Sequence, residues 1–327
     1  QLMEMTPEDS AARVLSNGQK AFGLGFLLVM VGLFAWQPLP TLIGLVTVVN
    51  LFYLCISFYR FYLIFNGMGR SLEIEVAAAE VGALDERDLP VYTILVPLYK
   101  EAAVLPVLTE SIARLDYPKA KLDVKLLLEE DDVDTIAVAR AANLPSHFNI
   151  IVVPNRPPKG KPKACNFGLL QAKGSFVVIF DAEDVPEADQ LKRVVIAFRK
   201  SDKRLGCVQC KLNYYNRDQN LLTRWFTSEY SMWFDLFLPG LNAVHAPIPL
   251  GGTSNHFPTL VLQDLGAWDP YNVTEDADLG IRLFKRGYTT AVVDSTTYEE
   301  ANSEIYNWIR QRSRWVKGYI QTWLVHM

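Results

Sequence analysis

The distribution of apolar residues divides the chain into two regions. Near the N-terminus, residues 21–36 and 41–65 are almost wholly apolar, and Gln37-Pro38-Leu39-Pro40 separates them. A membrane span needs roughly 20 apolar residues, so the first stretch is slightly short and the second is ample. We therefore predict a transmembrane hairpin over residues 21–66. A cleaved signal peptide would explain only the first stretch, and a hairpin buried inside a soluble protein is the other alternative.

The charges that flank these two stretches predict their orientation. Arg13 and Lys20 precede the hairpin, and Arg60 and Arg70 close or follow it, whereas the connecting loop has no Lys or Arg. Because cytoplasmic flanks carry the excess of Lys and Arg, both ends of the hairpin are predicted to be cytoplasmic. Residues 1–20 then form a loosely ordered N-terminal cytoplasmic segment, and residues 67–90 form a polar linker.

After residue 90, short apolar runs alternate with segments of helical period. The predicted strands are residues 91–96, 124–128, 147–153, 176–180 and 205–214, and the predicted helices are residues 101–114, 162–172, 187–200, 274–286 and 304–324. This alternation predicts an α/β fold with a mostly parallel sheet and helices on both faces. We predict one α/β domain over residues 91–303, followed by an interfacial helix over residues 304–327.

Composition narrows the picture further. Residues 219–238 carry six aromatic rings among charged residues, which predicts an amphipathic helix against the sheet or on the membrane surface. Gly251 to His256 is predicted to form a tight polar turn. The net charge of −4, without a dense basic cluster, argues against nucleic-acid binding. Cys207 and Cys210 lie in a predicted strand without a second pair or a nearby His, which argues against a zinc site.

Carboxylates follow the most apolar of the predicted strands. The run from Phe176 to Phe180 continues directly into Asp181, Glu183 and Asp184. An unbroken apolar run indicates a strand buried on both faces, and parallel sheets bind ligands outside the carboxyl ends of their strands. A divalent cation, Mg²⁺ or Mn²⁺, bound by Asp181 and Glu183, would remove the repulsion between these acids. The alternative is that the acids only cap the helix that follows.

Further charged residues predict a phosphate ester as the ligand. Four acids at residues 129–132 follow another strand, Glu275-Asp276 begins a predicted helix, and Arg312 and Arg314 lie in the last helix. An arginine binds diphosphate through a bidentate fork that lysine cannot copy, and we assign this role to Arg314. The sequence G-x-x-x-x-G-K-[ST] is absent, so the predicted phosphate site is not a P-loop.

Together these segments resemble the family 2 glycosyltransferases, in the membrane-embedded branch that includes bacterial cellulose synthase and related exopolysaccharide synthases. The resemblance covers about residues 91–320, with the motifs in the family's order. The matching segments are Val96-Pro-Leu-Tyr-Lys-Glu101 for V-P-x-Y-x-E, Lys163-Ala-Cys-Asn166 for K-A-x-N, Asp181-Ala-Glu183 for D-x-D, Thr274-Glu-Asp276 for T-E-D, and Gln311-Arg-Ser-Arg-Trp315 for Q-x-x-R-W.

The resemblance implies a GT-A-type fold and a role for each matching residue. Asp276 is expected to be the catalytic base, and Asp181 and Glu183 are expected to bind the metal. The expected nucleotide-sugar-binding residues are Pro97, Tyr99, Glu101, Glu130, Asp131, Lys163, Asn166, Asp181, Gln311, Arg312 and Arg314. The expected acceptor-binding residues are Trp315, Glu275, Gly252 and Thr253. Trp315 as an interfacial anchor, and Gly251 to His256 as a plain structural turn, are the alternatives.

Three features depart from the family's pattern. The first acidic pair is blurred into residues 129–132, of which Glu130 and Asp131 are our choice for the nucleotide contact. Glu183 replaces the second Asp of D-x-D, and Asp184 is an alternative metal ligand. The family's later transmembrane helices and gating loop are expected beyond Met327 or in a partner subunit.

The resemblance also implies a function. It implies an inverting, metal-dependent hexosyltransferase, multi-pass in the bacterial inner membrane, with its active site on the cytoplasmic side. A sugar, glucose by resemblance, would move from a UDP-sugar to a growing β-linked polysaccharide, processively and with export. The alternatives are addition of one sugar to a membrane lipid, a nucleotide-sugar-binding module without turnover, and a metal-dependent nucleotide hydrolase. Because Asp276 lies in the first turn of a helix, its ionised form is favoured and a modest proton affinity is expected.

Overall fold

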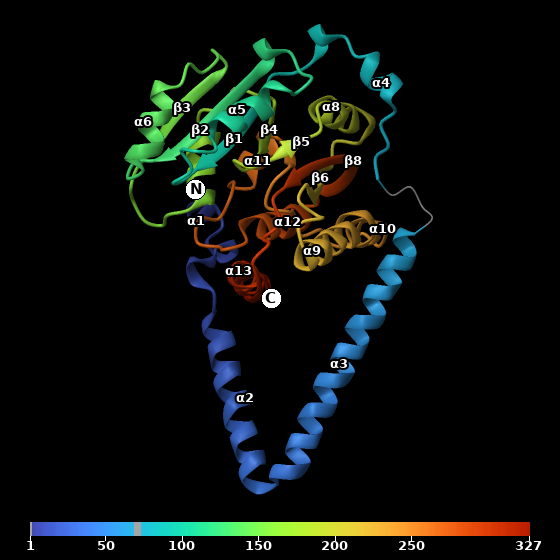
Figure 1. Cartoon of the computed structure of the whole chain (residues 1–327). Coiled ribbons are helices and arrows are strands. Elements are labelled where there is room, and N and C mark those ends of the chain that lie inside the picture. The colour runs from blue at the N-terminus through green and yellow to red at the C-terminus, as the bar shows by residue number, and fades with distance from the viewer. Residues whose placement is uncertain (1, 69–72) are drawn as a thin grey trace.

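One mixed sheet forms the centre of the fold. The computed structural model describes residues 2–68 and 73–327, and within them the sheet has eight strands in the order β3-β2-β1-β4-β7-β6-β8-β5 (Figure 1). The strands are β1 Tyr92–Leu98, β2 Leu122–Glu129, β3 Phe148–Val153, β4 Phe176–Ile179, β5 Val185–Pro186, β6 Leu205–Tyr214, β7 Asn255–Pro258 and β8 Thr289–Glu299.

Most neighbouring strands run parallel, which confirms the predicted fold class. β1 pairs in parallel with β2 and β4, β2 with β3, and β6 with β8. Two short strands run the other way, because β7 is antiparallel to β4 and β6, and β5 is antiparallel to β8. Six of the seven residues of β1 are buried, as both covered faces of a parallel sheet require.

Helices cover both faces of this sheet. On one face, α5 Leu105–Ala113 and α8 Gln190–Lys200 pack against the β1 face that carries Ile94 and Val96. On the other face, α7 Lys161–Leu169, α11 Thr259–Asp264 and α12 Glu275–Lys285 pack against the face that carries Leu95 and Leu127. The remaining helix on the first half of the domain is α6 Val133–Ala141. Successive residues of β1 therefore belong to different cores, in agreement with the period of two.

Three strands, the two-residue β5 and the longer β7 and β8, did not follow from the apolar pattern. β8 has threonines and a serine on either side of its two adjacent valines, so a search for apolar runs misses it although its β-branched residues favour a strand. The predicted turn over Gly251 to His256 is wrong in its second half, because Asn255–Pro258 is β7. The fully buried His256 lies between the hydroxyl of Tyr92, 2.7 Å from its Nδ1, and the thiol of Cys210, 3.3 Å from its Nε2. These partners allow a polar residue in the middle of a sheet.

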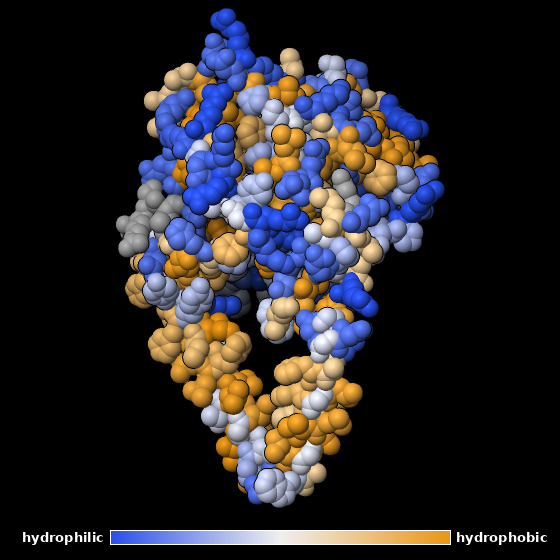
Figure 2. Space-filling model, turned by 180° about the vertical axis from the view of Figure 1, so that it is seen from behind, coloured by the Kyte–Doolittle hydropathy of each residue, from blue (hydrophilic) through white to orange (hydrophobic). Residues whose placement is uncertain are grey.

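Two long apolar helices form a V-shaped hairpin below the α/β domain. They are α2 Asn17–Trp36 and α3 Pro38–Gly67, and both are long and apolar enough to cross a membrane (Figure 1). Their apolar side chains are exposed along both arms, as Figure 2 shows, so they are not the core helices of a soluble protein. This surface supports membrane association. Arg70, one of the residues used to predict the orientation, lies outside the described residues.

The aromatic segment is a broken helix and not the single amphipathic helix that we predict. It consists of α9 Leu221–Ser231, a π-helical turn at Met232–Phe237 and α10 Leu238–Ala243. A Cβ atom on Gly240 would lie within 2.8 Å of the carbonyl carbon of Leu63, so glycine allows α3 to contact α10 directly. The end of the hairpin is therefore packed against this segment, with Leu63, Phe234 and Leu238 in one apolar cluster.

The N-terminal segment is docked on the domain, so the predicted loose order is wrong. Its helical turns are α1 Leu2–Met5, Pro7–Asp9 and Ala11–Arg13. The Ser10 hydroxyl and the Ala11 N–H donate to the two carboxylate oxygens of Asp269, at 3.1 and 2.6 Å. Leu2 is buried against Gly266. Buried polar partners such as Asp269 hold this polar segment against the domain. Composition alone does not reveal such partners.

Candidate active site

The candidate site lies where β4 ends. Asp181 follows β4, and the loop 251–254 lies beside it because β4 and β7 are antiparallel neighbours. The N–H of Ser254 and the hydroxyl of Thr253 both donate to the carbonyl oxygen of Ile179, at 3.0 and 2.9 Å. These bonds fix the glycine-led loop against the carboxyl end of β4, the edge at which parallel sheets bind ligands.

Lys161 connects these two loops. Its Nζ donates to Asp181 Oδ1 at 2.5 Å and to the carbonyl oxygen of Gly252 at 2.7 Å. Burial lowers the pKa of Lys161, but the charges of Asp181 and Glu275 outweigh burial and raise that pKa above its usual value. Lys161 is therefore a cation among acids. We did not assign it a role from sequence, because our alignment of the K-A-x-N motif selects Lys163 instead.

Asp276 lies at the same site as Asp181. A Cβ atom on Gly252 would lie 3.5 Å from Asp276 Oδ2, so the carboxylate of Asp276 is next to the loop that Lys161 contacts. Thr274 precedes α12 at its N-cap position without a side-chain capping bond, and Asp276 Oδ1 accepts from the N–H of Ala277 at 2.8 Å. Two acids from distant parts of the chain thus face one lysine.

The expected modest proton affinity of Asp276 is wrong. Burial raises the pKa of Asp276 above the ordinary aspartate value, and the hydrogen bond from Ala277 and the charge of Lys161 offset only part of this effect. Burial and the charge of Asp276 likewise raise the pKa of Glu275. The start of the helix lowers the pKa of Asp276, but this effect is weaker than the rise caused by the loss of hydration. A raised pKa suits a group that has to accept a proton.

Other acids surround Asp181 and repel it. Burial, followed by the charges of Asp181 and Glu183, raises the pKa of Glu101 to about 7. Burial, followed by the charges of Asp184, Asp181 and Glu183, raises the pKa of Glu299. Glu299 is the last residue of β8, the strand that the apolar pattern missed. The site therefore holds more negative charge than Lys161 alone can balance.

The donor set fits a divalent cation that also binds a phosphate ligand. Asp184 Oδ2 accepts from the N–H of Asp181 at 2.7 Å and from the Thr253 hydroxyl, whereas its buried Oδ1 has no hydrogen-bond partner in the described part of the chain. Over residues 2–68 and 73–327, no three His, Cys, Asp or Glu side chains form a ready metal cluster. Mg²⁺ and Mn²⁺ need only one or two carboxylates when substrate phosphates supply further oxygens. Asp181, partly exposed, and Glu183, exposed, can supply them.

The four acids at the end of β2, residues 129–132, have four different partners. Glu129 is buried and pairs with Lys163 at 2.7 Å, and Asp132 accepts from the N–H of Lys100 at 2.5 Å. Exposed Glu130 accepts from the N–H of Asn155 at 2.9 Å, and Asp131 pairs with Lys159 at 2.7 Å. Glu130 and Asp131, our choice for the nucleotide contact, are therefore the two that face solvent. Pro97 lies near the end of β1, which pairs with β2, and the exposed Tyr99 directly follows β1.

Lys163 and Asn166 hold neighbouring loops. Besides Glu129, Lys163 Nζ donates to the carbonyl oxygens of Pro154 and Arg156, at 2.9 and 3.3 Å. The Asn166 amide donates to the carbonyl oxygen of Trp268 at 2.8 Å and accepts from its N–H at 3.1 Å. Direct contact with a nucleotide, the role expected for both, would require Lys163 to exchange one of its three bonds, whereas the Asn166 amide keeps one N–H for a further partner.

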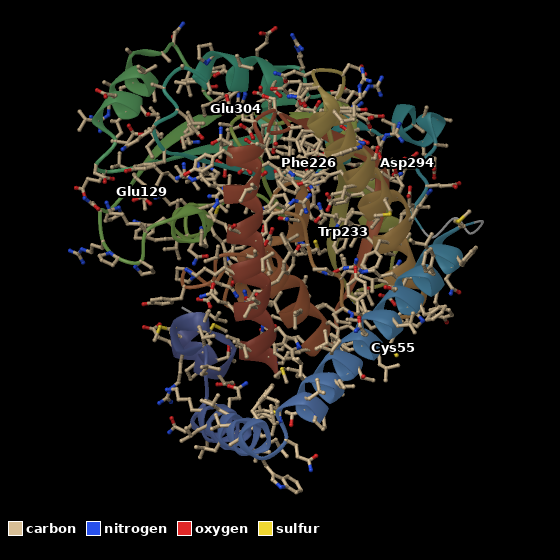
Figure 3. The ribbon with its side chains drawn as sticks, turned by 60° about the horizontal axis from the view of Figure 1, so that its bottom comes forward. Cys55, Glu129, Phe226, Trp233, Asp294 and Glu304 are labelled. Carbon is tan, nitrogen blue, oxygen red and sulfur yellow. The ribbon has the colours of Figure 1, made fainter. Side chains whose placement is uncertain are left out.

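The last helix carries the Q-R-S-R-W residues on different sides. It is α13 Ile305–His326, seen in Figure 3 between the labelled Glu129 and Phe226. Arg312 Nη1 donates to Glu229 at 2.7 Å, and its guanidinium lies 4.8–5.2 Å from the rings of Phe226, Trp308 and Trp315. The ring of Trp315 contacts those of Phe226 and Tyr230, with centroids 6.0 and 6.4 Å apart.

Arg314 lies on the opposite flank of α13 from Arg312. It is exposed and lines a hollow of about 610 Å³ with Asn302, Asn307, Arg310 and Gln311, where Asn302 donates to Gln311 at 2.8 Å. Among the described residues, Arg314 has no ion pair with either Asp181 or Asp276. Tyr319 of α13 lies close enough to Asp276 to feel its charge. Burial, followed by the charge of Asp276, raises the pKa of Tyr319 to about 12.

Comparisons with known proteins identify the family of this chain and several relatives. A family model described as "Glycosyltransferase like family 2" matches residues 90–318. The probable glycosyltransferase YdaM of Bacillus subtilis is 26% identical over 241 residues, which are 71% of this chain and 56% of the relative. Beta-monoglucosyldiacylglycerol synthase of Trichormus variabilis is 27% identical over 243 residues, which are 72% of this chain and 50% of the relative.

The fold also has a solved counterpart. The mannosyltransferase PcManGT from Pyrobaculum calidifontis, solved with GDP-Man and Mn²⁺, superposes with a TM-score of 0.56 and 24% identity, over 73% of this chain and 65% of the other. At this identity the similarity shows the fold alone, which is the GT-A-like α/β architecture. The chain spans about half the length of the curated relatives that it matches.

Proposed function

Since the chain belongs to glycosyltransferase family 2, we propose that it is an inverting, metal-dependent glycosyltransferase that moves a sugar from a UDP-sugar to an acceptor hydroxyl at a membrane. The observation that carries this proposal is the meeting of Asp181 and Asp276 around Lys161 at the carboxyl end of β4. Glucose is the proposed sugar, by the resemblance of the motifs.

The proposed reaction assigns one role to each group. Asp276 takes the proton of the acceptor hydroxyl while that oxygen bonds to the anomeric carbon, and the bond from that carbon to the diphosphate oxygen breaks with its electron pair leaving on UDP. Attack opposite to the leaving group inverts the anomeric configuration. Asp181 and Glu183 would hold the divalent cation, which offsets charge on the leaving diphosphate. Lys161 orients Asp181 and adds positive charge beside it.

The acceptor side of the site is formed by α12 and α13. Gly252 and Glu275 adjoin Asp276, and we propose that they line the acceptor path, whereas the buried Thr253 is proposed to hold the loop that carries Gly252. Trp315 would offer an aromatic face to a sugar ring after a shift of the rings that now cover it. Arg314, with Gln311, would bind diphosphate from the hollow that both line, whereas Arg312 would have to leave Glu229 to do so.

Two acceptors remain candidates, and we place the membrane lipid first. The exposed apolar hairpin and a relative named for synthesis of a glucosyl lipid support it. The growing β-linked polysaccharide, with processive addition and export, is the acceptor that the sequence resemblance put first; it rests on the Q-R-S-R-W motif and is now our second candidate. In both cases we propose a multi-pass protein of the bacterial inner membrane with its active site on the cytoplasmic side.

Product size separates the two acceptors. The full chain in proteoliposomes with Mn²⁺ would receive radiolabelled UDP-glucose, with UDP-galactose and UDP-GlcNAc as matched donors. A lipid-extractable product of one fixed size supports the lipid acceptor, and a labelled polymer whose length grows with time supports the second candidate. Release of UDP without any glycosylated product would instead indicate a hydrolase, and donor binding without UDP release would indicate a binding module.

Transfer is expected to fall in acid with a midpoint well above the ordinary aspartate pKa of about 3.9. A base accepts a proton only when it is deprotonated, so the burial that raises the pKa of Asp276 moves the loss of activity to higher pH. The check is kcat/KM measured from pH 4.5 to 8.5 at fixed ionic strength, which should rise with unit slope before a plateau. A flat profile over this range would contradict the assignment of a raised pKa to the base.

A further inference from the structure

Three residues one helical turn apart on α13 contact the start of α12. They are Gly318, Thr322 and His326, at the i, i+4 and i+8 positions that share one face of a helix. Their partners are Thr274, Asn272 and Asp278, which lie immediately before and within the first turn of α12. Asp276 stands in the middle of this short segment. We call these contacts the α12–α13 seam.

Gly318 forms the closest contact of the seam. A Cβ atom on Gly318 would lie within 2.8 Å of three side-chain atoms of Thr274. Real Cβ atoms do not approach other atoms so closely, so any larger residue at position 318 would move Thr274 or α13. Thr274 is two residues before Asp276, and its carbonyl oxygen accepts from the N–H of Asp278 at 3.1 Å in the first turn of α12. A shift of Thr274 therefore shifts the backbone that carries the base.

Thr322 and Asn272 fix the same segment by hydrogen bonds. The Asn272 side chain donates to the Thr322 hydroxyl at 2.9 Å and accepts from the N–H of Thr274 at 3.1 Å. Asn272, Thr274 and Thr322 are all buried, so water does not replace these bonds when one is lost. Asn272 thus links the side chain of Thr322, on α13, to the backbone of Thr274, two residues before Asp276.

His326 extends the seam to the N-terminal segment. Its Nε2 lies 2.7 Å from Asp278 Oδ1, and Asp278 Oδ2 accepts from Arg282 at 2.8 Å within α12. Asp9 pairs with Lys285 and lies 3.5 Å from His326 Nδ1. The side chain of Gln19, in the first turn of α2, donates to the carbonyl oxygen of Leu324 at 2.8 Å. The start of the hairpin and the end of α13 are therefore held as one unit.

We propose that the α12–α13 seam sets the position of Asp276 relative to α13, so that Gly318, Thr322 and Asn272 are positioning residues for proton removal from the acceptor. This inference rests on the proposed function. α13 carries Trp315 on the same stripe, one turn before Gly318, so the seam fixes the distance between the base and the acceptor side of the site. Displacement of a reacting group by about 1 Å can cost on the order of 10²-fold in rate.

Thr322→Val tests the hydrogen bond with nearly unchanged volume. It removes the only acceptor that the described residues offer to the Asn272 amide hydrogens, so kcat is expected to fall by about tenfold, while the KM for the UDP-sugar stays within about twofold. Thr322→Ser keeps the hydroxyl and should restore most of the wild-type kcat. Ile320→Val, on the exposed side of the same helix, is the matched control and should leave kcat unchanged.

Gly318→Ala tests the close contact independently. Its kcat is expected to fall by on the order of 10²-fold, and Thr274→Ser in the same chain should recover part of the loss, because the methyl group of Thr274 is one of the overlapping atoms. If Gly318→Ala only lowered the stability of the protein, Thr274→Ser would not restore activity.

Three results would overturn the inference. The first is a wild-type kcat in Thr322→Val. The second is a loss of kcat in Thr322→Ser as large as that in Thr322→Val. The third is a fall of kcat in Thr322→Val together with a parallel rise in the KM for the UDP-sugar. If Asp276→Asn keeps transfer activity, the proposed function fails first. If Asp276→Asn abolishes transfer but both seam variants are fully active, only the positioning role fails.

Discussion

Replacing Asp276 by Asn is expected to reduce sugar transfer by about 10³-fold, while UDP binding changes by less than about threefold, because general base catalysis typically contributes 10²–10⁴-fold. Asn has the same shape and keeps an oxygen that can accept from the N–H of Ala277, so the first turn of α12 should be unchanged. What is lost is the negative charge that takes the acceptor proton. The measurement is the initial rate of transfer together with the Kd for UDP from calorimetry.

The control for this variant is Asp264→Asn, which makes the same chemical change at an exposed site at the end of α11. It should transfer sugar at the wild-type rate. Transfer by Asp276→Asn at more than about a tenth of the wild-type rate would show that another group removes the proton. Glu275, adjacent to Asp276, would then be the first residue to test.

Replacing Asp181 by Asn is expected to lower kcat/KM for the UDP-sugar by on the order of 10³-fold and to raise the Mn²⁺ concentration needed for half-maximal rate by at least about tenfold, because one of the two proposed carboxylate ligands becomes neutral. Unlike Asp276→Asn, this change should weaken UDP binding. The N–H of residue 181 can still donate to Asp184, so the loop should keep its shape. Lys161 would lose its carboxylate partner.

Titration of the rate with Mn²⁺ at fixed UDP-sugar, and UDP binding with and without Mn²⁺, measure this effect. Asp134→Asn, an exposed aspartate in the first turn of α6, is the matched control. An unchanged Mn²⁺ requirement in Asp181→Asn would remove Asp181 from the metal site and leave Glu183 and Asp184 as the candidates. The two variants therefore separate the chemistry of the base from the binding of the donor.

Sequence patterns were sufficient for the layers of the fold. Apolar runs such as Phe176 to Phe180 predicted buried parallel strands, and the two apolar stretches before residue 67 predicted the hairpin. Both predictions follow from the local density of apolar residues, which can be counted along the chain. The patterns failed for β5, β7 and β8. Buried polar side chains of β7 and β8 find hydrogen-bond partners elsewhere in the fold, as His256 does with Tyr92 and Thr297 does with Ser254.

The direction of single side chains could not be predicted in the same way. Lys161 and Lys163 are two residues apart on a helix, which separates their directions by about 200°. Lys161 contacts Asp181 and Lys163 contacts Glu129, on different sides of α7. The same separation places Arg312 against Glu229 and Arg314 in the hollow beside Asn302. The motif identified the segment in each case but not the residue that faces the acids.

The protonation of Asp276 was likewise not predictable from the sequence pattern. The position of Asp276 at a helix start predicted an easily ionised carboxyl, whereas burial beside Glu275 and Gly252 raises its pKa. Sequence patterns were enough to predict the class of fold, the apolar helical hairpin and the order of the acidic motifs, because these depend on composition and on period along the chain. The folded structure was needed to show that Asp276 lies beside the Gly252 loop to which Lys161 binds together with Asp181, and that α13 contacts the first turn of α12. Those contacts join residues whose separation along the chain carries no information about their distance in space.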